Sequence, residues 1–339
     1  MKKILIYTLT IVLGLTLLSG CLPGSSTNDS TTTESESHDL EGSKGEEYYM
    51  VTFVSEIEYW KGCYKGFEEA ATRYNVTPIY DGEPDYDTDK CIKKLDEIIA
   101  KKPAGIALTC MDSEAYTESI NKAMEQGIEV VCFDADSEGS NRYSFLSTDN
   151  VAAGNTAANT IADLIQNEGD VIVVTLEDQS NHQDRTKGFK ETIENKYPNV
   201  NVVDVISGGS EQIKAAKATA EAIEKYPNVK AIFATDATSG TGVAAAVKEI
   251  NKIGDIKILS FDTDKSTLDL IKEGTIDASL AQGTWNMGFW SLQFLFQVNH
   301  NLINPTSDWK IDGINPLPEF VDTGVSIVKK SNVDAFYID

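Results

Sequence analysis

From Tyr48 onward, short apolar runs alternate with longer amphipathic stretches, and this alternation constrains the fold more than any other feature. The run Tyr48–Ser55 predicts a buried strand, and apolar side chains from Trp60 to Tyr74 recur at helical spacing. Such alternation is typical of parallel sheets covered by helices on both faces. About ten such units exceed one comfortable sheet, so we predict an α/β fold of two doubly wound lobes.

Turn residues set the expected limits of individual elements. The strand Val76–Tyr80 is expected to end at the turn pair Asp81-Gly82. Gly127 lies where a residue that ends the preceding helix, 114–126, belongs.

The sequence also contains a short repeated motif. One unit ends in Phe133-Asp134-Ala135-Asp136, and a later unit ends in Phe261-Asp262-Thr263-Asp264. Each is a strand, a helix and a second strand followed by Phe-Asp-x-Asp. Ligands of open α/β sheets bind outside the carboxyl ends of the strands, so Asp134 and Asp262 are predicted to point into one cleft if the lobes face each other. Acids that only cap the following helices are the alternative.

The first twenty residues are predicted to be an export signal. Lys2 and Lys3 precede the apolar run Ile4–Leu18, which is shorter than the roughly 20 residues of a membrane span. The run ends in Leu18-Ser19-Gly20-Cys21, which resembles the bacterial lipobox and implies cleavage before Cys21 and lipidation of that cysteine; an ordinary secretory signal is the alternative. Residues 21–47, rich in Ser, Thr, Gly, Asp and Glu, are predicted to form a disordered tether.

Charge and missing motifs exclude several functions. A formal net charge of −24 would repel the phosphates of nucleic acids and anionic lipid headgroups. The sequence has no H-E-x-x-H, P-loop or G-x-S-x-G motif, so we predict no enzyme, no cofactor and no metal site. It also has no C-x-x-C pair, and the later cysteines are expected to be buried thiols, with a disulfide left open: Cys63, Cys91, Cys110 and Cys132.

Two segments imitate ligand motifs. Asp85–Asp89 starts like a calcium loop, but Lys90 holds the required glycine position, so a helix-capping turn is expected. Gly240–Ala245 reads G-x-G-x-x-A before Asp262, which imitates a dinucleotide fingerprint. Because the first glycine lies too far from the preceding strand for a tight turn, we expect these small residues to allow close packing of a helix on a sheet.

The polar side chains at the predicted strand tips suit a neutral polyol. Carboxylates and amides can accept or bridge pairs of hydroxyls, a guanidinium adds a forked donor, and aromatic rings stack on apolar sugar faces. Charge-assisted hydrogen bonds contribute about 1.5–3 kcal/mol each. The helical spacing of Trp60 fits a core position equally well. The predicted acceptors, fork and aromatic residues are Asp134, Asp136, Asp236, Asp262, Arg185, Tyr59 and Trp60.

Several stretches resemble the type I periplasmic sugar-binding proteins, the ribose/glucose/galactose class of ABC-transporter receptors. The resemblance runs from about residue 48 to Val325 and implies two Rossmann-like lobes joined by a three-strand hinge near Thr148, Gly283 and Asp322. It is carried, in the family's order, by residues 55–62, 131–136, 148–154, 184–189, 231–236, 258–262 and 278–283.

The same resemblance implies roles for individual residues. Arg185 would clamp sugar oxygens, Tyr59 or Trp60 would stack on the ring, and Asn181 would supply an amide. The residues implied to bind hydroxyls are Asp134, Asp262 and Gln282. Ile57 and Asp236 stand where ribose binders carry asparagine, so a hexose or another polyol is at least as strongly favoured as ribose.

The resemblance finally implies an organisation and a function. The expected parts are the signal, 1–20, the tether, 21–47, an N-terminal lobe, 48–148 plus 283–321, and a C-terminal lobe, 149–282 plus 322–339. We expect a receptor anchored by lipid on the extracytoplasmic face of the cell membrane, which captures a neutral monosaccharide and delivers it to an ABC permease. A sensor that presents the same fold to a membrane histidine kinase or chemoreceptor is the alternative, and an exported enzyme is less favoured.

Overall fold

The computed structural model describes residues 40–338, so the predicted signal segment, Cys21 and most of the predicted tether lie outside the described residues. None of the helices between residues 40 and 338 is long and apolar enough to cross a bilayer. The elements, in chain order, are β1 (Glu47–Phe53), α1 (Tyr59–Tyr74), β2 (Thr77–Glu83), α2 (Thr88–Ile99), β3 (Gly105–Leu108), α3 (Thr117–Glu125), β4 (Glu129–Phe133), β5 (Phe145–Ser147), α4 (Asn150–Leu164), β6 (Gly169–Thr175), α5 (Ser180–Lys196), β7 (Val200–Ser207), α6 (Gln212–Lys225), β8 (Val229–Ala234), α7 (Ala237–Glu249), β9 (Lys257–Phe261), α8 (Lys265–Glu273), β10 (Ala278–Gln282), α9 (Thr284–Asn299), β11 (Phe320–Asp322), β12 (Val325–Lys329) and the 3₁₀ turn η1 (Val333–Phe336).

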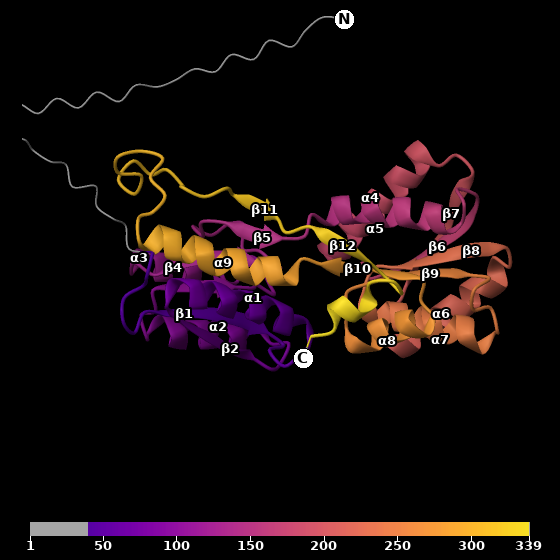
Figure 1. Ribbon diagram of the computed structural model, residues 1–339, viewed down its shortest axis with the longest axis horizontal. Helices are drawn as coiled ribbons and strands as arrows, with labels where there is room; N and C mark the ends of the chain where they lie inside the picture. Colours follow the sequence, from indigo (N-terminus) through magenta and orange to yellow (C-terminus); the bar gives the residue numbers. More distant parts are fainter. Residues whose placement is uncertain (1–39, 339) are drawn as a thin grey trace, which may run out of the picture. The chain divides into compact units, whose positions relative to one another are not determined.

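Two six-stranded sheets organise the chain (Figure 1). The first sheet has the order β11-β5-β4-β3-β1-β2 with every pair parallel, and we call it, with its helices, the N-terminal lobe. The second has the order β12-β10-β9-β8-β6-β7, in which only β12 runs antiparallel to its neighbour, and it forms the C-terminal lobe. The predicted α/β class with two doubly wound sheets is therefore confirmed.

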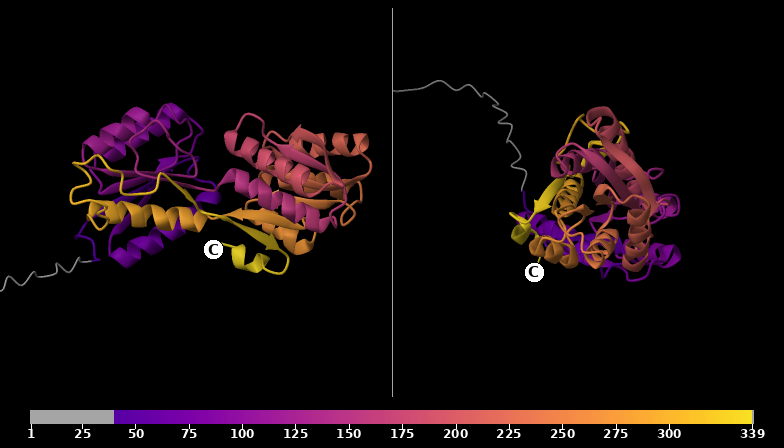
Figure 2. Two further views of the ribbon diagram at one scale, coloured as in Figure 1. Left: turned by 90° about the horizontal axis from the view of Figure 1, so that it is seen from above. Right: turned by 90° about the vertical axis from the view of Figure 1, so that its right-hand side faces the viewer.

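Helices cover both faces of each sheet (Figure 1, Figure 2). In the N-terminal lobe, Met50 packs with α1 and α9 on one face, while its neighbour Val51 packs with α2 and α3 on the other. In the C-terminal lobe, Ile172 packs with α6 to α8, and Val173 packs with α4 and α5. Alternate residues of a central strand thus enter two different cores, which explains the continuous apolar runs in the sequence.

Three segments carry the chain between the sheets, after β5, after β10 and after β11. They are joined to one another by hydrogen bonds. The N–H of Thr323 donates to the carbonyl of Ser147 at 2.9 Å, and the N–H of Gly283 donates to the carbonyl of Gly324 at 3.0 Å. A carboxylate oxygen of Asp322 accepts from the N–H of Asp149 at 3.0 Å. We call residues 147–150, 282–284 and 322–324 the first, second and third crossing segments.

Two local expectations differ from the structure. The predicted turn pair Asp81-Gly82 lies inside β2, because Gly82 passes so close to β1 that a Cβ would lie 2.1 Å from the carbonyl oxygen of Thr52. The glycine is therefore needed for close approach of two strands rather than for a turn. The fold also begins before the predicted end of the tether, since the N–H of Gly42 donates to the carbonyl of Tyr74 and β1 starts at Glu47.

The segments that imitate ligand motifs have structural roles. Asp87 caps α2 by accepting from the N–H of Lys90, as expected of a helix-capping turn. Gly240 lies in the first turn of α7, where a Cβ would lie 1.9 Å from the hydroxyl of Ser260, so the small residues let α7 pack on β9. The four later cysteines are buried free thiols; the sulfurs of Cys110 and Cys132 are 3.8 Å apart.

Candidate functional site

Asp134 and Asp262, the aspartates of the repeated Phe-Asp-x-Asp motif, occupy equivalent places in the two lobes. Asp134 follows β4 and Asp262 follows β9, and both have left-handed backbone, with φ of 61° and 64°. The carbonyl of each accepts from a serine hydroxyl of the neighbouring strand, from Ser147 at 3.0 Å and from Ser279 at 2.7 Å. Left-handed backbone is uncommon outside glycine and persists where the surroundings hold it. The repeated motif in the sequence therefore corresponds to the same strand-end geometry in both lobes.

Asp134 is held by the aromatic residue that begins α1. The hydroxyl of Tyr59 donates to Oδ1 of Asp134 at 2.7 Å. Burial raises the pKa of Asp134, while this hydrogen bond and the charge of Arg185 act in the opposite direction. The Tyr59 ring is thus placed at the cleft by its own hydroxyl, and the second carboxylate oxygen of Asp134 is left for another donor.

Arg185 enters the site from α5, which packs unusually close to α4. A Cβ on Gly188 would lie 2.1 Å from the carbonyl oxygen of Val151, and a Cβ on Gly154 would lie 2.1 Å from that of Arg185. Only glycine permits such an approach of two helix backbones. The glycines of the two resembling motifs therefore fix where the Arg185 side chain starts.

The guanidinium of Arg185 is held on two of its three nitrogens and on one face. Its Nε donates to Oδ1 of Asn150 and its Nη1 donates to the carbonyl of Thr235, each at 2.8 Å. Its Cζ lies 3.8 Å from the centre of the Phe261 ring, a cation–π contact. Nη2 makes no hydrogen bond within residues 40–338 and is the free arm of the fork.

The charge of Arg185 is compensated by the carboxylates of both lobes. The side chain is 3% exposed, and burial lowers the pKa of its guanidinium. Asp262, Asp134 and Asp236 oppose that shift, as does Tyr59. All three carboxylates therefore act electrostatically on this one guanidinium.

Asp236 caps α7 and keeps one oxygen unpaired. Its Oδ1 accepts from the N–H of Ser239 at 2.8 Å, while its Oδ2 has no hydrogen-bond partner among residues 40–338 although the side chain is only 8% exposed. His182 lies beside it, and burial together with the charge of Arg185 lowers the pKa of this histidine to about 4. At neutral pH the histidine is therefore uncharged, and the Asp236 carboxylate stays available to a ligand donor.

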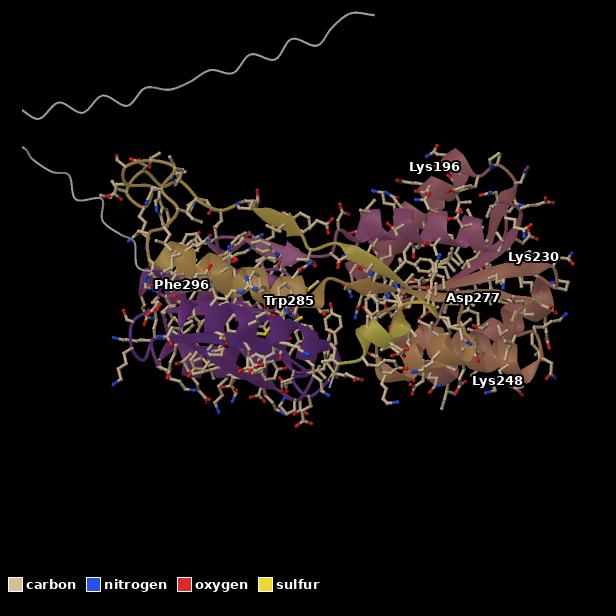
Figure 3. The ribbon with its side chains drawn as sticks, in the orientation of Figure 1. Lys196, Lys230, Lys248, Asp277, Trp285 and Phe296 are labelled. Carbon is tan, nitrogen blue, oxygen red and sulfur yellow. The ribbon has the colours of Figure 1, made fainter. Side chains whose placement is uncertain are left out.

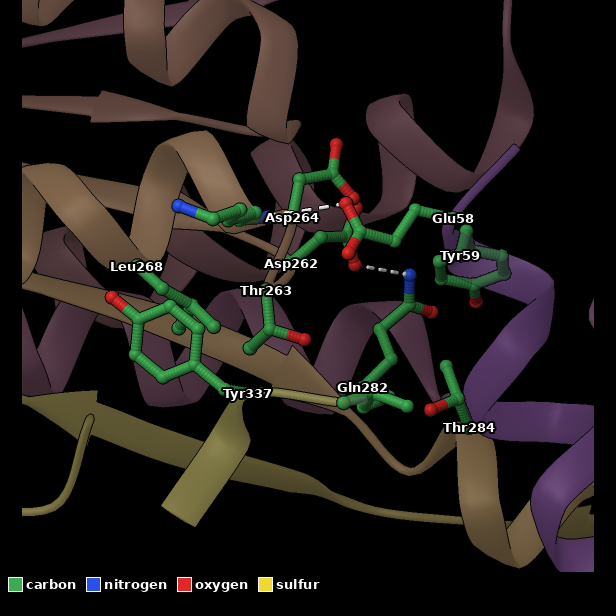
Figure 4. Close-up of a pocket in the computed structure, with 11 residues that line it drawn as sticks. Glu58, Tyr59, Asp262, Thr263, Asp264, Leu268, Gln282, Thr284 and Tyr337 are labelled. Atoms are coloured by element: carbon green, nitrogen blue, oxygen red, sulfur yellow. Dashed lines mark hydrogen bonds between the residues drawn. The ribbon is translucent and has the colours of Figure 1, made fainter. Parts of the chain in front are cut away.

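Asp262 is joined to two crossing segments. Nε2 of Gln282 donates to Oδ1 of Asp262 at 2.8 Å, and Oε1 of Gln282 accepts from the hydroxyl of Thr148 at 2.9 Å (Figure 4 shows the first of these bonds). Burial raises the pKa of Asp262 to about 7, although Arg185 and the Gln282 amide both lower it. Burial therefore outweighs the compensation that Arg185 and Gln282 give this carboxylate.

A cavity of about 180 Å³ lies next to these groups (Figure 4). At its mouth the carboxylate of Glu58, from the loop before α1, accepts from the N–H of Lys265 at the start of α8 at 3.3 Å. The two lobes thus meet at this hydrogen bond. The cavity is lined by Glu58, Tyr59, Asp262, Thr263, Asp264, Lys265, Leu268, Gln282, Thr284, Tyr337 and Ile338.

The balance of charge in the site is acidic. The charges of Asp134, Asp236 and Asp262 all act on one guanidinium, while lysines such as Lys196 and Lys248 project from the outer surface of the C-terminal lobe (Figure 3). Within residues 40–338, no group of three or more His, Cys, Asp or Glu side chains could hold a metal ion. The arrangement can accept hydrogen bonds from several hydroxyls and offer one charged donor in return.

Three of the predicted site residues have other contacts. Both oxygens of Asp136 are held by Arg142, at 2.6 and 2.5 Å, so this carboxylate is committed to an ion pair rather than facing a ligand. Trp60 is 2% exposed and its ring N–H donates to the carbonyl of Phe53, which favours the core position over stacking on a sugar. The Oδ1 of Asn181 accepts from the N–H of His182.

Sequence reasoning missed the residues that orient the site. Asn150 and Thr148 lie within a motif that resembles the family, but no role was inferred for either because both act through another side chain. Glu58 was also missed, since its partner is 207 residues away in the sequence. Only their placement beside Arg185, Gln282 and α8 reveals them.

Comparisons with known proteins show the family to which this fold belongs. Residues 48–300 match the periplasmic binding protein domain. AraP, an arabinose binding protein from Geobacillus stearothermophilus, is 50% identical, with a TM-score of 0.83 over 87% of this chain and 100% of that one. A sugar ABC transporter (sugar-binding protein) from Bacillus halodurans is 47% identical, with a TM-score of 0.83 over 86% and 100%. The D-allose-binding periplasmic protein of Escherichia coli is 24% identical over 81% of this chain and 89% of its own length. The chain therefore belongs to the periplasmic binding protein family and, within it, to the type I sugar-binding proteins of ABC transporters.

Proposed function

We propose that this protein is a lipid-anchored extracytoplasmic receptor that captures a neutral monosaccharide, with arabinose as the first candidate, and delivers it to an ABC permease. The observation that carries the proposal is that three carboxylates act on the single buried guanidinium of Arg185, which is held by Asn150 and the carbonyl of Thr235. The groups without a hydrogen bond among residues 40–338 include a donor, Nη2 of Arg185, and an acceptor, Oδ2 of Asp236. A polyol offers hydroxyls that can meet both at once.

The charge of the site favours an uncharged ligand. A phosphate or a carboxylate would enter a partly desolvated space beside Asp134, Asp236 and Asp262, whose repulsion one guanidinium cannot offset. Arabinose is put first because AraP, the arabinose binding protein, is 50% identical over nearly the whole described part of this chain.

The proposal is tested by titration calorimetry on the purified protein, in a detergent without a sugar headgroup. Neutral pentoses and hexoses are compared with sugar acids and sugar phosphates. We expect one neutral sugar to bind more tightly than any anionic one, and that sugar at 100 times its Kd to stabilise the native state by about 2.7 kcal/mol. Tighter binding of an anionic sugar would contradict the proposed ligand class.

Two buried arginines provide a matched pair of variants. Arg185→Lys keeps the charge but removes the fork, so we expect sugar affinity to fall by at least about tenfold. Arg142→Lys makes the same change at a buried arginine whose partner is Asp136, and we expect its affinity to stay within about twofold of the wild type. Equal losses in both variants would argue that Arg185 acts through the fold and not through the ligand.

The lipid anchor is tested separately. Cys21→Ser should release the protein from the membrane fraction of the cells that make it, because the thiol that would carry the lipid is gone. Retention of the Cys21→Ser protein in the membrane fraction after a salt wash would contradict anchoring through this cysteine.

A further inference from the structure

The first crossing segment holds the sugar site through a continuous chain of hydrogen bonds. The hydroxyl of Thr148 donates to Oε1 of Gln282 at 2.9 Å, and Nε2 of Gln282 donates to Oδ1 of Asp262 at 2.8 Å. Thr148 is 3% exposed, so no bulk water competes for its hydroxyl. This series of hydrogen bonds starts on the first crossing segment, passes through the second and ends on a carboxylate of the site; Figure 4 shows its last bond, from Gln282 to Asp262.

The direction of each bond in this chain is fixed by chemistry. While Asp262 is ionised its carboxylate can only accept, so the NH₂ group of Gln282 turns toward it. Its carbonyl oxygen then faces Thr148 and needs a donor there. A threonine hydroxyl can donate, whereas a side chain without a polar hydrogen would leave that oxygen unpaired and allow the amide to turn over.

The hydrogen bonds from Thr148 through Gln282 also determine which carboxylate oxygen of Asp262 is available to the ligand. Oδ1 is occupied by the Gln282 amide, and Oδ2 makes no hydrogen bond within residues 40–338. The backbone of Asp262 is fixed independently, by its left-handed φ and by the hydroxyl of Ser279 on its carbonyl. The side-chain torsions of Asp262 still allow the carboxylate to turn, and the hydrogen bond from the Gln282 amide restrains them.

We propose that Thr148 is a positioning residue for sugar binding, whose hydroxyl fixes the amide of Gln282 and thereby aims Oδ2 of Asp262 at the ligand. This inference rests on the proposed function, since it assigns a role within the same site. Thr148 itself contacts Gln282 and does not have to touch the sugar.

The third crossing segment supplies a natural control. Thr323 is also buried, at 6% exposed, but its hydroxyl has no hydrogen-bond partner within residues 40–338. Thr→Val replaces a hydroxyl with a methyl group of similar size. The same substitution at the two positions therefore removes a paired hydroxyl in one case and an unpaired one in the other.

The test compares Thr148→Val, Thr148→Ser and Thr323→Val with the wild type, each as the purified full chain titrated with arabinose and with the neutral sugar that the wild type binds best. We expect Thr148→Val to bind about 3- to 10-fold more weakly, which corresponds to the loss of one neutral hydrogen bond. Thr148→Ser and Thr323→Val should bind within about twofold of the wild type. If Thr148→Val does not melt cooperatively, Thr148→Ala replaces it, with Thr323→Ala as its control.

The pH dependence of affinity separates positioning from a general loss of structure. In Thr148→Val the amide is free to present its carbonyl to Asp262, which favours the protonated acid, so the acidic pH at which affinity halves should move upward. The charged groups that also face Asp262 are unchanged in the variant: Arg185 of α5, Asp236 before α7 and Asp264 of the same loop.

The possible outcomes distinguish the two proposals. If the wild type binds no neutral sugar, the proposed function is wrong and the role of Thr148 is wrong with it. If the wild type binds and Thr148→Val keeps the same affinity and pH profile, or Thr323→Val loses as much affinity, the role of Thr148 is wrong and the proposed function stands.

Discussion

Asp262 should destabilise the sugar-free protein at neutral pH, and the size of the effect follows from its titration. Burial raises the pKa of Asp262 from 3.8 to about 7 in the folded protein. Between these two pH values the folded state binds more protons than the unfolded state, so the free energy of unfolding falls as the pH rises through this window. A difference of about three pKa units corresponds to roughly 4 kcal/mol, and water that reaches the partly buried carboxylate reduces this to about 1–3 kcal/mol.

The informative variant is Asp262→Asn. Asparagine keeps the shape of aspartate and can still accept from the Gln282 amide through Oδ1, but it cannot carry charge. At pH 4 the variant and the wild type should be similarly stable, because Asp262 is protonated in the folded wild type. At pH 8 we expect the variant to melt about 2–6 °C higher. Its sugar affinity should nevertheless be lower, since a charge-assisted acceptor is lost.

Differential scanning calorimetry without sugar, at pH 4 and pH 8, measures the effect. Asp163→Asn is the control, because it removes a charge from an exposed position on α4. The reasoning is refuted if the difference in Tm between Asp262→Asn and the wild type is the same at both pH values. It is also refuted if Asp262→Asn melts below the wild type at pH 8.

Two further substitutions probe the scaffold of the site. Gly188→Ala would place a Cβ 2.1 Å from the carbonyl oxygen of Val151, so we expect a loss of more than about 3 kcal/mol of stability by calorimetry and weaker sugar binding, because α5 carries Arg185; an unchanged Tm would contradict the required close approach of α4 and α5. Asp136→Asn leaves the buried Arg142 without its charged partner and should cost about 3 kcal/mol of stability with no change in sugar affinity, whereas lost affinity at an unchanged Tm would return Asp136 to the ligand set.

The fold and the strand-end positions of Asp134 and Asp262 could be predicted because they depend on local pattern. Residues such as Met50 and Val51 pack into cores on opposite faces of one strand, and this leaves an apolar run that any parallel sheet would show. The repeated Phe-Asp-x-Asp marks two strand ends, and topology alone places Asp134 and Asp262 at equivalent edges.

The remaining features depend on contacts between segments that are distant in the sequence. Asp136 and Asp134 look equivalent in the sequence, yet only the former meets Arg142 and is withdrawn from the cleft. The sequence around Gly82 predicts a turn, and only the position of β1 beside it shows that the glycine is needed for close approach of two strands.

Local pattern therefore determined the elements, their layers and which acids reach the strand ends, because backbone geometry and burial repeat with a fixed period along the chain. The tertiary structure alone decided which acid is paired, which amide is held and which arm of Arg185 is free. Hydrogen bonds and ion pairs are short-ranged and directional, so partners such as Thr148 and Gln282, 134 residues apart, leave no periodic trace in the sequence.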